Sequence, residues 1–228
     1  MSKKTNYNGW ELNFFDQAQN FRDYQWSLFK NKIKNYVLEV GPGNCVFLDR
    51  YNSKSKKIHL FEPSIKIRNR IKKKFKTIKK VKVISKYSKS KYDSIIYLDV
   101  LEHIKDDKIE VFNAYNRLKK KGHLIISVPA FQHLYTDYDK KIGHFRRYSK
   151  KEFNNIFSKL KIKKYTMKYF DSIGYFLILF SKYLKFSNKV NFKGSVKIWN
   201  FLIPISKILD FFLNRILGKS LMVIIQKN

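Results

Sequence analysis

The sequence is poor in the residues and runs that mark secreted or membrane-spanning proteins. Its 228 residues contain one cysteine, Cys45, which excludes an internal disulfide and a zinc site built from several cysteines. The opening MSKKTNYNGWELNFFD lacks the apolar run of a secretory signal peptide. Two apolar stretches, 173–186 and 196–217, are interrupted by charged residues and are not expected to be transmembrane helices. These absences favour a cytoplasmic protein in a reducing compartment.

Acidic residues are also scarce. The chain has 17 Asp and Glu against 49 Lys and Arg, a formal net charge of +32, and residues 66–91 contain thirteen basic side chains and no acid. This balance suits nucleic acid or an anionic membrane surface as a partner. The alternative is codon drift in an AT-rich genome, because Lys, Ile, Asn, Phe and Tyr are all abundant.

Short apolar runs rich in β-branched residues predict buried strands. The expected strands are 36–40, 58–61, 81–84, 94–98, 124–128, 162–169 and the closing SLMVIIQK. A helix is expected over 104–118 with Gly122 at its C′ position, and Ser149 with Glu152 forms a capping box before another helix. Strands that alternate with helices predict an α/β fold with a doubly wound, mostly parallel sheet.

The length fits a single domain with one embellishment. We divide it into four segments. They are an N-terminal segment 1–34, a core 35–169, an amphipathic helical insertion 170–218 and a final strand 219–228.

The stretch VLEVGPGNC, residues 37–45, places a carboxylate and two glycines directly after the first predicted strand. Gly41 and Gly43 lack a Cβ, so the backbone there can approach a ligand closely. Glu39 would repel a phosphate and instead suits a cationic ligand. Glu62 ends the second predicted strand, and its carboxylate can accept hydrogen bonds from both hydroxyls of a ribose. Both acids are expected at one crevice beyond the carboxyl ends of the strands.

This pattern resembles the class I S-adenosylmethionine-dependent methyltransferases, in which E-x-G-x-G surrounds the methionine part of the cofactor. YDSIIYLDVLEHIKDD (92–107) and LKKKGHLIISVPA (118–130) resemble the fourth and fifth strand segments of that superfamily. The resemblance implies a Rossmann-like sheet with its last strand antiparallel, an N-terminal helical lid and a helical insertion before the last strand. It also implies S-adenosylmethionine as cofactor, bound by Glu39, Gly41, Gly43, Glu62 and Asp99, with Tyr24 and Trp26 from the lid.

The chain departs from the superfamily pattern at two places. Cys45 stands where a third glycine is usual, and its small side chain is expected to pack near a helix start. The superfamily usually offers an acid to the adenine amino group after the third strand, whereas ISKYSKSKYD provides none before Asp93. Recognition of adenine is expected to use backbone groups or Ser88. For Tyr24 and Trp26, packing in the core is the alternative to a place in the lid.

Methyl transfer from a sulfonium is an in-line displacement, so the protein must align an acceptor and accept its proton. LDVLEH lacks the [DNS]-P-P-[YFW] sequence of amide-methylating nucleic-acid enzymes, which argues against N-methylation of bases. It resembles the E-x-x-E-H of ubiquinone-biosynthesis O-methyltransferases and of small-RNA 2′-O-methyltransferases. The expected catalytic residues, near the ends of the fourth and fifth strands, are Asp99, His103 and His144.

The resemblance to the RNA enzymes implies metal ligands. There the acids and a histidine, with a second histidine after the fifth strand, hold a divalent ion against the substrate hydroxyls. Carried over, the ligands are Asp99, Glu102, His103 and His144, a set that suits Mg²⁺ or Mn²⁺. The alternative is that Glu102 and His103 cap a helix start, with His103 packed over the cofactor.

Residues 128–153, VPAFQHLYTDYDKKIGHFRRYSKKEF, resemble a bacterial methyltransferase subfamily with the signature V-P-A…D…G-H-x-R-R-Y-[ST]. That subfamily is often encoded among genes for cell-surface polysaccharides and other glycoconjugates. The resemblance implies that His144 is a base or a metal ligand. It also implies an acceptor phosphate or carboxylate bound by Arg146, Arg147 and Tyr148. The alternative is that the arginines pair with Asp137 and Asp139 to fix the loop.

The sequence therefore predicts an S-adenosylmethionine-dependent O-methyltransferase for a sugar hydroxyl of a glycan or glycolipid precursor. The alternatives are a quinone or lipid acceptor, or a metal-assisted RNA 2′-O-methyltransferase with steeply salt-dependent binding. No recognised RNA-binding module accompanies the catalytic segments. The apolar stretches within 173–217 are expected to contact a membrane through their basic residues, to form an ordinary helical embellishment or to form a dimer surface. The oligomeric state is not indicated.

Overall fold

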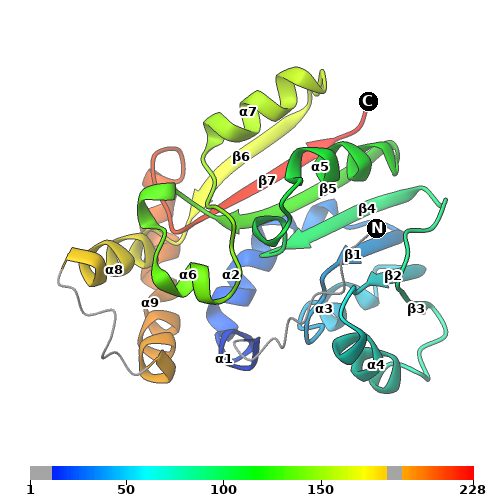
Figure 1. Cartoon of the computed structure of the whole chain (residues 1–228), viewed down its shortest axis with the longest axis horizontal. Helices are drawn as coiled ribbons and strands as arrows, with labels where there is room; N and C mark the ends of the chain where they lie inside the picture. The colour runs from blue at the N-terminus through cyan, green and yellow to red at the C-terminus, as the bar shows by residue number, and fades with distance from the viewer. Residues whose placement is uncertain (1–11, 184–191) are drawn as a thin grey trace.

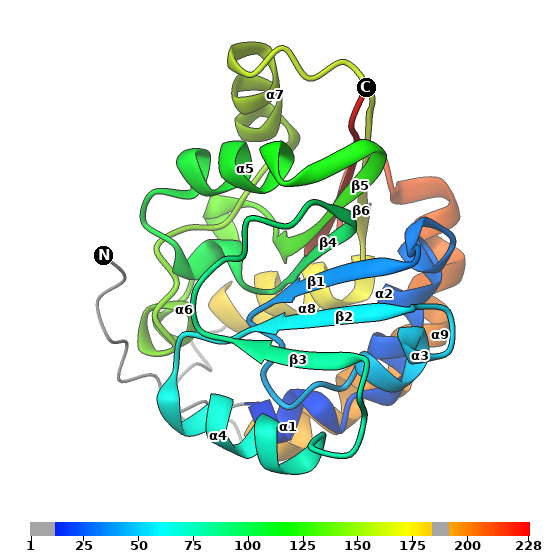
Figure 2. The ribbon, with the colours of Figure 1, turned by 90° about the vertical axis from the view of Figure 1, so that its right-hand side faces the viewer.

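The computed structural model describes residues 12–183 and 192–228, and a seven-stranded sheet forms the centre of this part of the chain. The strand order is β3-β2-β1-β4-β5-β7-β6, with β3 at one edge (Figures 1 and 2). The strands are β1 (Tyr36–Val40), β2 (Lys57–Phe61), β3 (Val81–Ile84), β4 (Tyr92–Leu98), β5 (Leu118–Pro129), β6 (Tyr165–Phe170) and β7 (Ser220–Gln226). The first five are parallel to one another, and β7 runs antiparallel between β5 and β6, so the predicted fold is confirmed.

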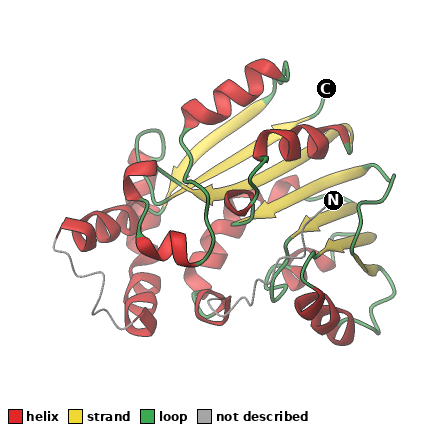
Figure 3. Cartoon of the chain, in the orientation of Figure 1, coloured by secondary structure: helices red, strands yellow, loops and turns green. Residues whose placement is uncertain are grey.

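Helices cover both faces of the sheet, as Figure 3 shows. On one face the core contains apolar side chains of α2 (Gln19–Phe29), α3 (Leu48–Asn52), α4 (Ile65–Lys74) and α9 (Phe192–Leu213). On the other face it contains side chains of α5 (Asp107–Asn116) and α7 (Lys150–Lys159). The remaining helical elements are α1 (Leu12–Asp16), α6 (Asp137–Lys141), α8 (Ser172–Tyr183), η1 (Lys30–Lys32), η2 (Leu101–His103) and η3 (Gln132–Leu134). The capping box of Ser149 and Glu152 at the start of α7 is confirmed.

The prediction for 104–118 was wrong at its end. The helix α5 stops at Asn116, and Gly122 lies inside β5 rather than after a helix. A Cβ at Gly122 would lie 2.9 Å from the Lys119 carbonyl oxygen, so the backbone there passes too close for a side chain. The basic run 119–121 resembled a helix end, but it lies in an irregular stretch of β5: Leu118 pairs with Tyr92, the register to β4 shifts, and regular pairing resumes at His123.

The two apolar stretches near the end form the helices α8 and α9, which pack against each other. None of the helices that the structure describes is long and apolar enough to cross a membrane. Asp210 connects α9 by hydrogen bonds to α2 and to the start of α8. Its buried carboxylate accepts hydrogen bonds from the backbone N–H groups of Asp171 (2.5 Å) and Ser172 (2.9 Å) and from the Tyr24 hydroxyl (2.8 Å).

We expect Asp210→Ala to lower the free energy of unfolding by about 3 kcal/mol or more, because three donors lose their acceptor and each costs about 1–3 kcal/mol when buried and unpaired. Urea unfolding followed by circular dichroism measures the change. Asp137→Ala removes an exposed acid from α6 and serves as the control. Equal losses in the two variants would contradict this role of Asp210.

Candidate active site

Three acids lie at the carboxyl edge of the sheet, because each is at or next to the carboxyl end of one of three neighbouring parallel strands. Glu39 lies near the end of β1 and pairs in register with Leu60 of β2 and Ile96 of β4. Glu62 follows β2 directly, and Asp99 follows β4 directly. The three acids therefore share the carboxyl edge, where ligands of open α/β sheets bind, and a cofactor crevice there stays a prediction.

Glu39 is buried, and the Tyr51 hydroxyl donates a 2.5 Å hydrogen bond to its Oε2. Burial raises the pKa of Glu39 to about 7, although the hydrogen bond from Tyr51 and the positive charge of Arg22 both act to lower it. A buried carboxylate of this kind is stabilised by any cation that comes to lie beside it.

The turn after β1 uses the left-handed backbone region. Gly41 has φ +63° and Gly43 has φ +54°, and a Cβ on Gly41 would lie 2.8 Å from a Val100 methyl group. Cys45 also has a positive φ, 63°, which is the physical reason that glycine suits this position in the superfamily. The Cys45 side chain is buried, as expected.

Glu62 is buried beside the start of α4, where its Oε1 accepts a 2.8 Å hydrogen bond from the Ser64 backbone N–H. Burial raises the pKa of Glu62, and the bond from Ser64 opposes this shift. Its position after β2 is the one that the ribose role requires. That role remains a prediction.

Helix α2 reaches the site through two residues that the sequence analysis missed. Arg22 Nη1 donates to Asp99 Oδ2 at 3.1 Å and to Gln25 Oε1 at 3.0 Å, and Gln25 Nε2 donates to the Ser127 hydroxyl at 2.8 Å. No motif marks these residues, because their partners lie 77 and 102 positions away.

The predicted lid residues have other surroundings. The Tyr24 hydroxyl donates a hydrogen bond to Asp210, and the Tyr24 ring packs edge-on against Phe170. Trp26 packs edge-on against Phe29, with Lys54 over its ring. These contacts are those of the core-packing alternative, and a role of either residue in cofactor binding stays a prediction.

The segment 130–148 after β5 forms a loop that is tied down at both ends. The Phe131 N–H donates to the Tyr148 carbonyl, and the Tyr148 N–H donates to the Pro129 carbonyl, both at 2.9 Å. The Phe145 N–H donates to the carbonyl of Glu102 at 2.9 Å, which fixes the far part of the loop to η2. The loop is therefore positioned over the ends of β4 and β5.

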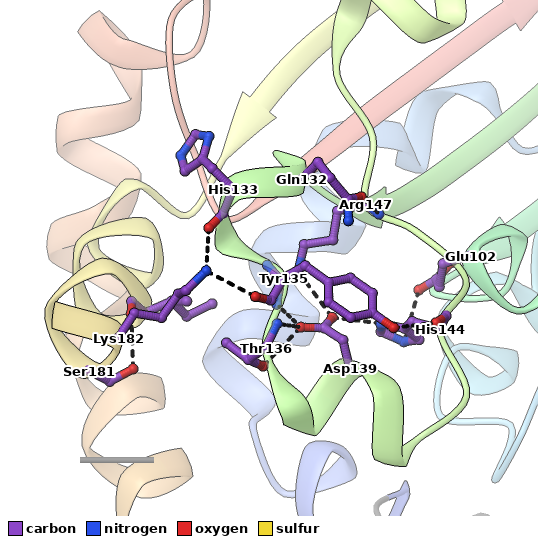
Figure 4. A network of polar contacts seen from close by, with 11 residues as sticks. Glu102, Gln132, His133, Tyr135, Thr136, Asp139, His144, Arg147, Ser181 and Lys182 are labelled. Carbon is purple, nitrogen blue, oxygen red and sulfur yellow. Dashed lines mark hydrogen bonds and ion pairs between the residues drawn. The ribbon is translucent and has the colours of Figure 1, made fainter. Parts of the chain in front are cut away.

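Within this loop, Arg147, Asp139 and His144 form a hydrogen-bonded chain (Figure 4). Arg147 donates to both carboxylate oxygens of Asp139, at 3.0 and 2.8 Å, and Asp139 Oδ1 lies 2.7 Å from His144 Nδ1. Burial would raise the pKa of Asp139, but the bonds from His144 and Arg147 outweigh it and hold the pKa below its usual range. Asp139 is therefore ionised and fixes the orientation of the imidazole.

The other imidazole nitrogen faces a second acid. His144 Nε2 lies 3.7 Å from Glu102 Oε1, and the His103 ring is edge-on to His144 with 4.7 Å between ring centroids. Glu102 is fully buried, and neither of its side-chain oxygens has a hydrogen-bond partner among the described residues. Burial and the negative charge of Asp99 raise the pKa of Glu102 well above its usual range. Burial, with His144 as the second cause, lowers the pKa of His103 to about 4.

The structure thus brings three of the four predicted metal ligands together. Glu102, His103 and His144 each offer one ligand atom, and these atoms lie within 4.8 Å of one another. Asp99 stands apart from this group and pairs with Arg22. The capping alternative does not hold for Glu102: it lies in the first turn of η2, but its side-chain oxygens accept no hydrogen bond among the described residues, and no side chain caps η2 or α5.

The remaining signature residues support the loop. Arg146 pairs with Asp107 at 2.8 Å, and the buried Tyr148 hydroxyl donates to the same carboxylate at 2.8 Å. The alternative that the arginines fix the loop is confirmed for Arg147 with Asp139, whereas Arg146 uses Asp107 in place of Asp137. Arg147 Nη1 is buried without a hydrogen-bond partner in the described part of the chain, so one donor of this side chain is left over after the pair with Asp139.

Comparisons with known proteins agree with this arrangement. The model of a family described as methyltransferase domain matches residues 15–165. No curated protein matches the chain significantly.

Several solved structures share the fold at low sequence identity. A S-adenosylmethionine-dependent methyltransferase from Archaeoglobus fulgidus is 14% identical with a TM-score of 0.60, and the match covers 98% of this chain and 100% of that one. Phosphoethanolamine N-methyltransferase 2 of Haemonchus contortus, solved with S-adenosylmethionine, is 14% identical with a TM-score of 0.63 over 96% of this chain and 57% of that one. An O-methyltransferase family protein from Burkholderia thailandensis is 10% identical with a TM-score of 0.60 over 93% and 56% of the two chains.

Proposed function

The chain belongs to the methyltransferase-domain family, and from this premise we propose that it is a class I S-adenosylmethionine-dependent methyltransferase that O-methylates a sugar hydroxyl of a glycan or glycolipid precursor. The similar structures include an N-methyltransferase and an O-methyltransferase family protein, so the fold leaves the acceptor open. The argument for a hydroxyl acceptor comes from the residues of the loop 130–148.

The observation that carries the proposal is the bond between Asp139 and His144. A neutral imidazole whose Nδ1–H donates to a carboxylate has its Nε2 lone pair available as a proton acceptor. His144 is 10% exposed, so this base is nearly shielded from water. A hydroxyl needs such a base because its oxygen becomes a good nucleophile only as the proton leaves.

In the proposed reaction the acceptor oxygen attacks the methyl carbon of the sulfonium in line with the carbon–sulfur bond. That bond breaks and its electron pair stays on sulfur, which leaves S-adenosylhomocysteine. The hydroxyl proton passes to His144 Nε2, and the ionised Asp139 stabilises the resulting imidazolium. Arg147 keeps the Asp139 carboxylate in place through two hydrogen bonds.

The sugar class rests on the resemblance of 128–153 to methyltransferases encoded among glycoconjugate genes. The unpartnered Nη1 of Arg147 supports an acceptor with a hydroxyl, phosphate or carboxylate oxygen near the methylated group. Quinone, lipid and RNA acceptors are the competing classes.

A metal-assisted form of the same reaction is the second candidate. It is favoured by Glu102, whose buried oxygens lack hydrogen-bond partners among the described residues beside two histidines. Glu102, His103 and His144 would hold Mg²⁺ or Mn²⁺, and the bound ion would acidify the acceptor hydroxyl. His144 Nε2 would then be a ligand, while Asp139 would still orient the ring.

The test is transfer of labelled methyl groups from S-adenosylmethionine to a panel of sugar nucleotides, lipid-linked sugars, quinols and small RNAs, with the product identified by mass spectrometry. We expect a methyl ether on a sugar hydroxyl and no product from the matched deoxy sugar. Methylation of an amine, a quinol or RNA alone would overturn the proposal. Repeating the assay with EDTA decides between the two forms: unchanged turnover supports the base, and loss restored by Mn²⁺ supports the metal.

A further inference from the structure

Helix α9 buries one side in the core and exposes large apolar residues on the opposite side. One stripe of residues at alternating spacings of three and four faces the core: Val196, Trp199, Ile203, Ser206 and Asp210. A second stripe with the same spacings faces outward and is exposed: Ile198, Phe201, Ile205, Ile208 and Phe212. We call the second set the outer stripe. A helix with one side in the core and large apolar residues on the other is expected to be covered on both sides.

The exposure of the outer stripe is large. Phe201 is 76% exposed, Ile208 is 69% and Phe212 is 73%, and the neighbouring Phe211 is 79%. The partner helix α8, which packs beside α9, exposes Phe180 at 62% as well. So many exposed aromatic and aliphatic side chains on adjoining helices mark an interaction surface.

The charges around the outer stripe select the kind of partner. Lys197, Lys207 and Arg215 are exposed on or just after α9. Between residues 172 and 217 the sequence has seven basic residues and one acid, Asp210, which is buried. A second copy of this chain would bring its own basic residues to the same face, and like charges would oppose the contact. An anionic surface has the complementary sign.

A hollow at the end of the stripe adds a second observation. It has a volume of about 450 Å³ and is lined by Lys168, Phe211, Phe212, Asn214 and Arg215. Apolar rings beside two exposed cations and an amide suit a lipid, whose acyl chains contact the rings while its phosphate meets the cations.

We propose that the outer stripe and this hollow dock the protein on the surface of an anionic lipid bilayer. The helix lies in the plane of the interface with its phenylalanines among the acyl chains and its basic residues at the headgroups.

The docked face is connected to the candidate active site. Lys182 of α8 donates to the carbonyl oxygens of His133 (2.6 Å) and Tyr135 (3.0 Å), in the loop that also carries Asp139 and His144 (Figure 4). A methyl acceptor anchored in the bilayer would therefore approach the protein near the loop 130–148, which α8 contacts. Lipid binding itself requires no methyl transfer, so its failure would be separate from a failure of the proposed reaction.

The test is flotation of the full chain with vesicles of phosphatidylcholine alone and of phosphatidylcholine mixed with phosphatidylglycerol, at low and high salt. We expect binding to the anionic vesicles that weakens as salt screens the charges. Phe201→Ser with Phe212→Ser should lower the partition coefficient by about tenfold or more, because two large apolar side chains are lost from the contact. Both positions are exposed, so the variant should keep the wild-type circular dichroism spectrum.

The matched control is Ile109→Ser with Phe112→Ser, which removes two exposed apolar side chains from α5 on the other face of the sheet. This variant should float as the wild type does. Wild-type protein that stays in the soluble fraction at low salt would overturn the proposal, and so would equal losses in the two double variants. A dimer in solution that the Phe201 and Phe212 substitutions dissociate would assign the stripe to a second copy instead.

Discussion

We expect His144→Ala to lower kcat for methyl transfer by about 10²- to 10⁴-fold, because removal of a positioned general base costs about that much. The affinity for S-adenosylmethionine should stay within about twofold of the wild type, since His144 is not among the residues predicted to bind the cofactor. Asp139→Asn keeps the shape of the orienting residue but removes its charge, so it should also lower kcat strongly. Rates measured at saturating cofactor and acceptor test both variants.

The control for this experiment is His133→Ala. His133 belongs to the same loop but is exposed, and its ring contacts the Tyr175 hydroxyl rather than the Asp139 group. It should retain the wild-type kcat. A His144→Ala enzyme with full turnover would remove His144 from the chemistry, whereas loss of cofactor binding in that variant would show that the substitution disturbs the fold of the site.

Glu39→Gln should weaken S-adenosylmethionine binding by about tenfold or more and stabilise the unliganded protein at pH 8. Burial raises the pKa of Glu39 from 4.5 to about 7, so the folded protein retains a proton that the unfolded chain releases. The free energy of unfolding therefore falls by about 3 kcal/mol as the pH rises from 4.5 to about 7, and it stays at this lower value above pH 7. Glutamine carries no charge and should remove most of this loss while still accepting the bond from Tyr51.

The same shift makes cofactor binding depend on pH. A cationic ligand favours the ionised form of Glu39, so wild-type affinity should rise between pH 6 and about pH 7.5, while the affinity of Glu39→Gln should stay flat. Calorimetric titration across this range gives the affinities, and thermal unfolding at pH 5.5 and pH 8 gives the stabilities. Two results would contradict this role of Glu39: a Glu39→Gln variant that binds S-adenosylmethionine as tightly as the wild type, or a wild-type affinity that does not change with pH.

Much of the fold could be predicted from the sequence because it depends on local patterns. Buried parallel strands are continuous apolar runs, so β1 and β3 begin and end where the sequence predicted them. The start of β5 could not be predicted in this way. Its residues 119–121 are all lysine, and they belong to the strand only because Leu118 before them pairs with Tyr92 and His123 after them pairs with Ser94 and Gln226.

The residues of the candidate site likewise fall into those that local sequence patterns could place and those that only tertiary packing brings together. Glu39, Glu62 and Asp99 could be placed at one edge because each lies next to the end of a predicted strand. For Asp139 the sequence left open a pairing with the signature arginines, which holds for Arg147, and it did not indicate that Asp139 also caps α6. Its contact with His144 depends on how the loop turns back on itself. The approach of Arg22 to Asp99 could not be predicted at all, since it results from the packing of α2 on the sheet.

The site and α9 are also joined through α2. Arg22 and Gln25 of this helix contact the carboxyl edge of the sheet, while Tyr24 contacts Asp210 of α9. One helix therefore links the carboxyl edge of the sheet to the helix that we propose to lie at the membrane. This arrangement gives the C-terminal helices a structural purpose beyond covering the sheet.

The whole account depends on the cofactor lying at the carboxyl edge between Glu39 and Glu62. Calorimetric titration with S-adenosylmethionine of the wild type, Glu62→Gln and Glu62→Ala tests this most directly, with Asp137→Ala as a control for the loss of an acid. We predict binding by the wild type and the control, and affinity about tenfold or more lower in both Glu62 variants, because a carboxylate that accepts from two ribose hydroxyls is lost. Equal affinity in all four proteins, or no binding by folded wild-type protein, would contradict it.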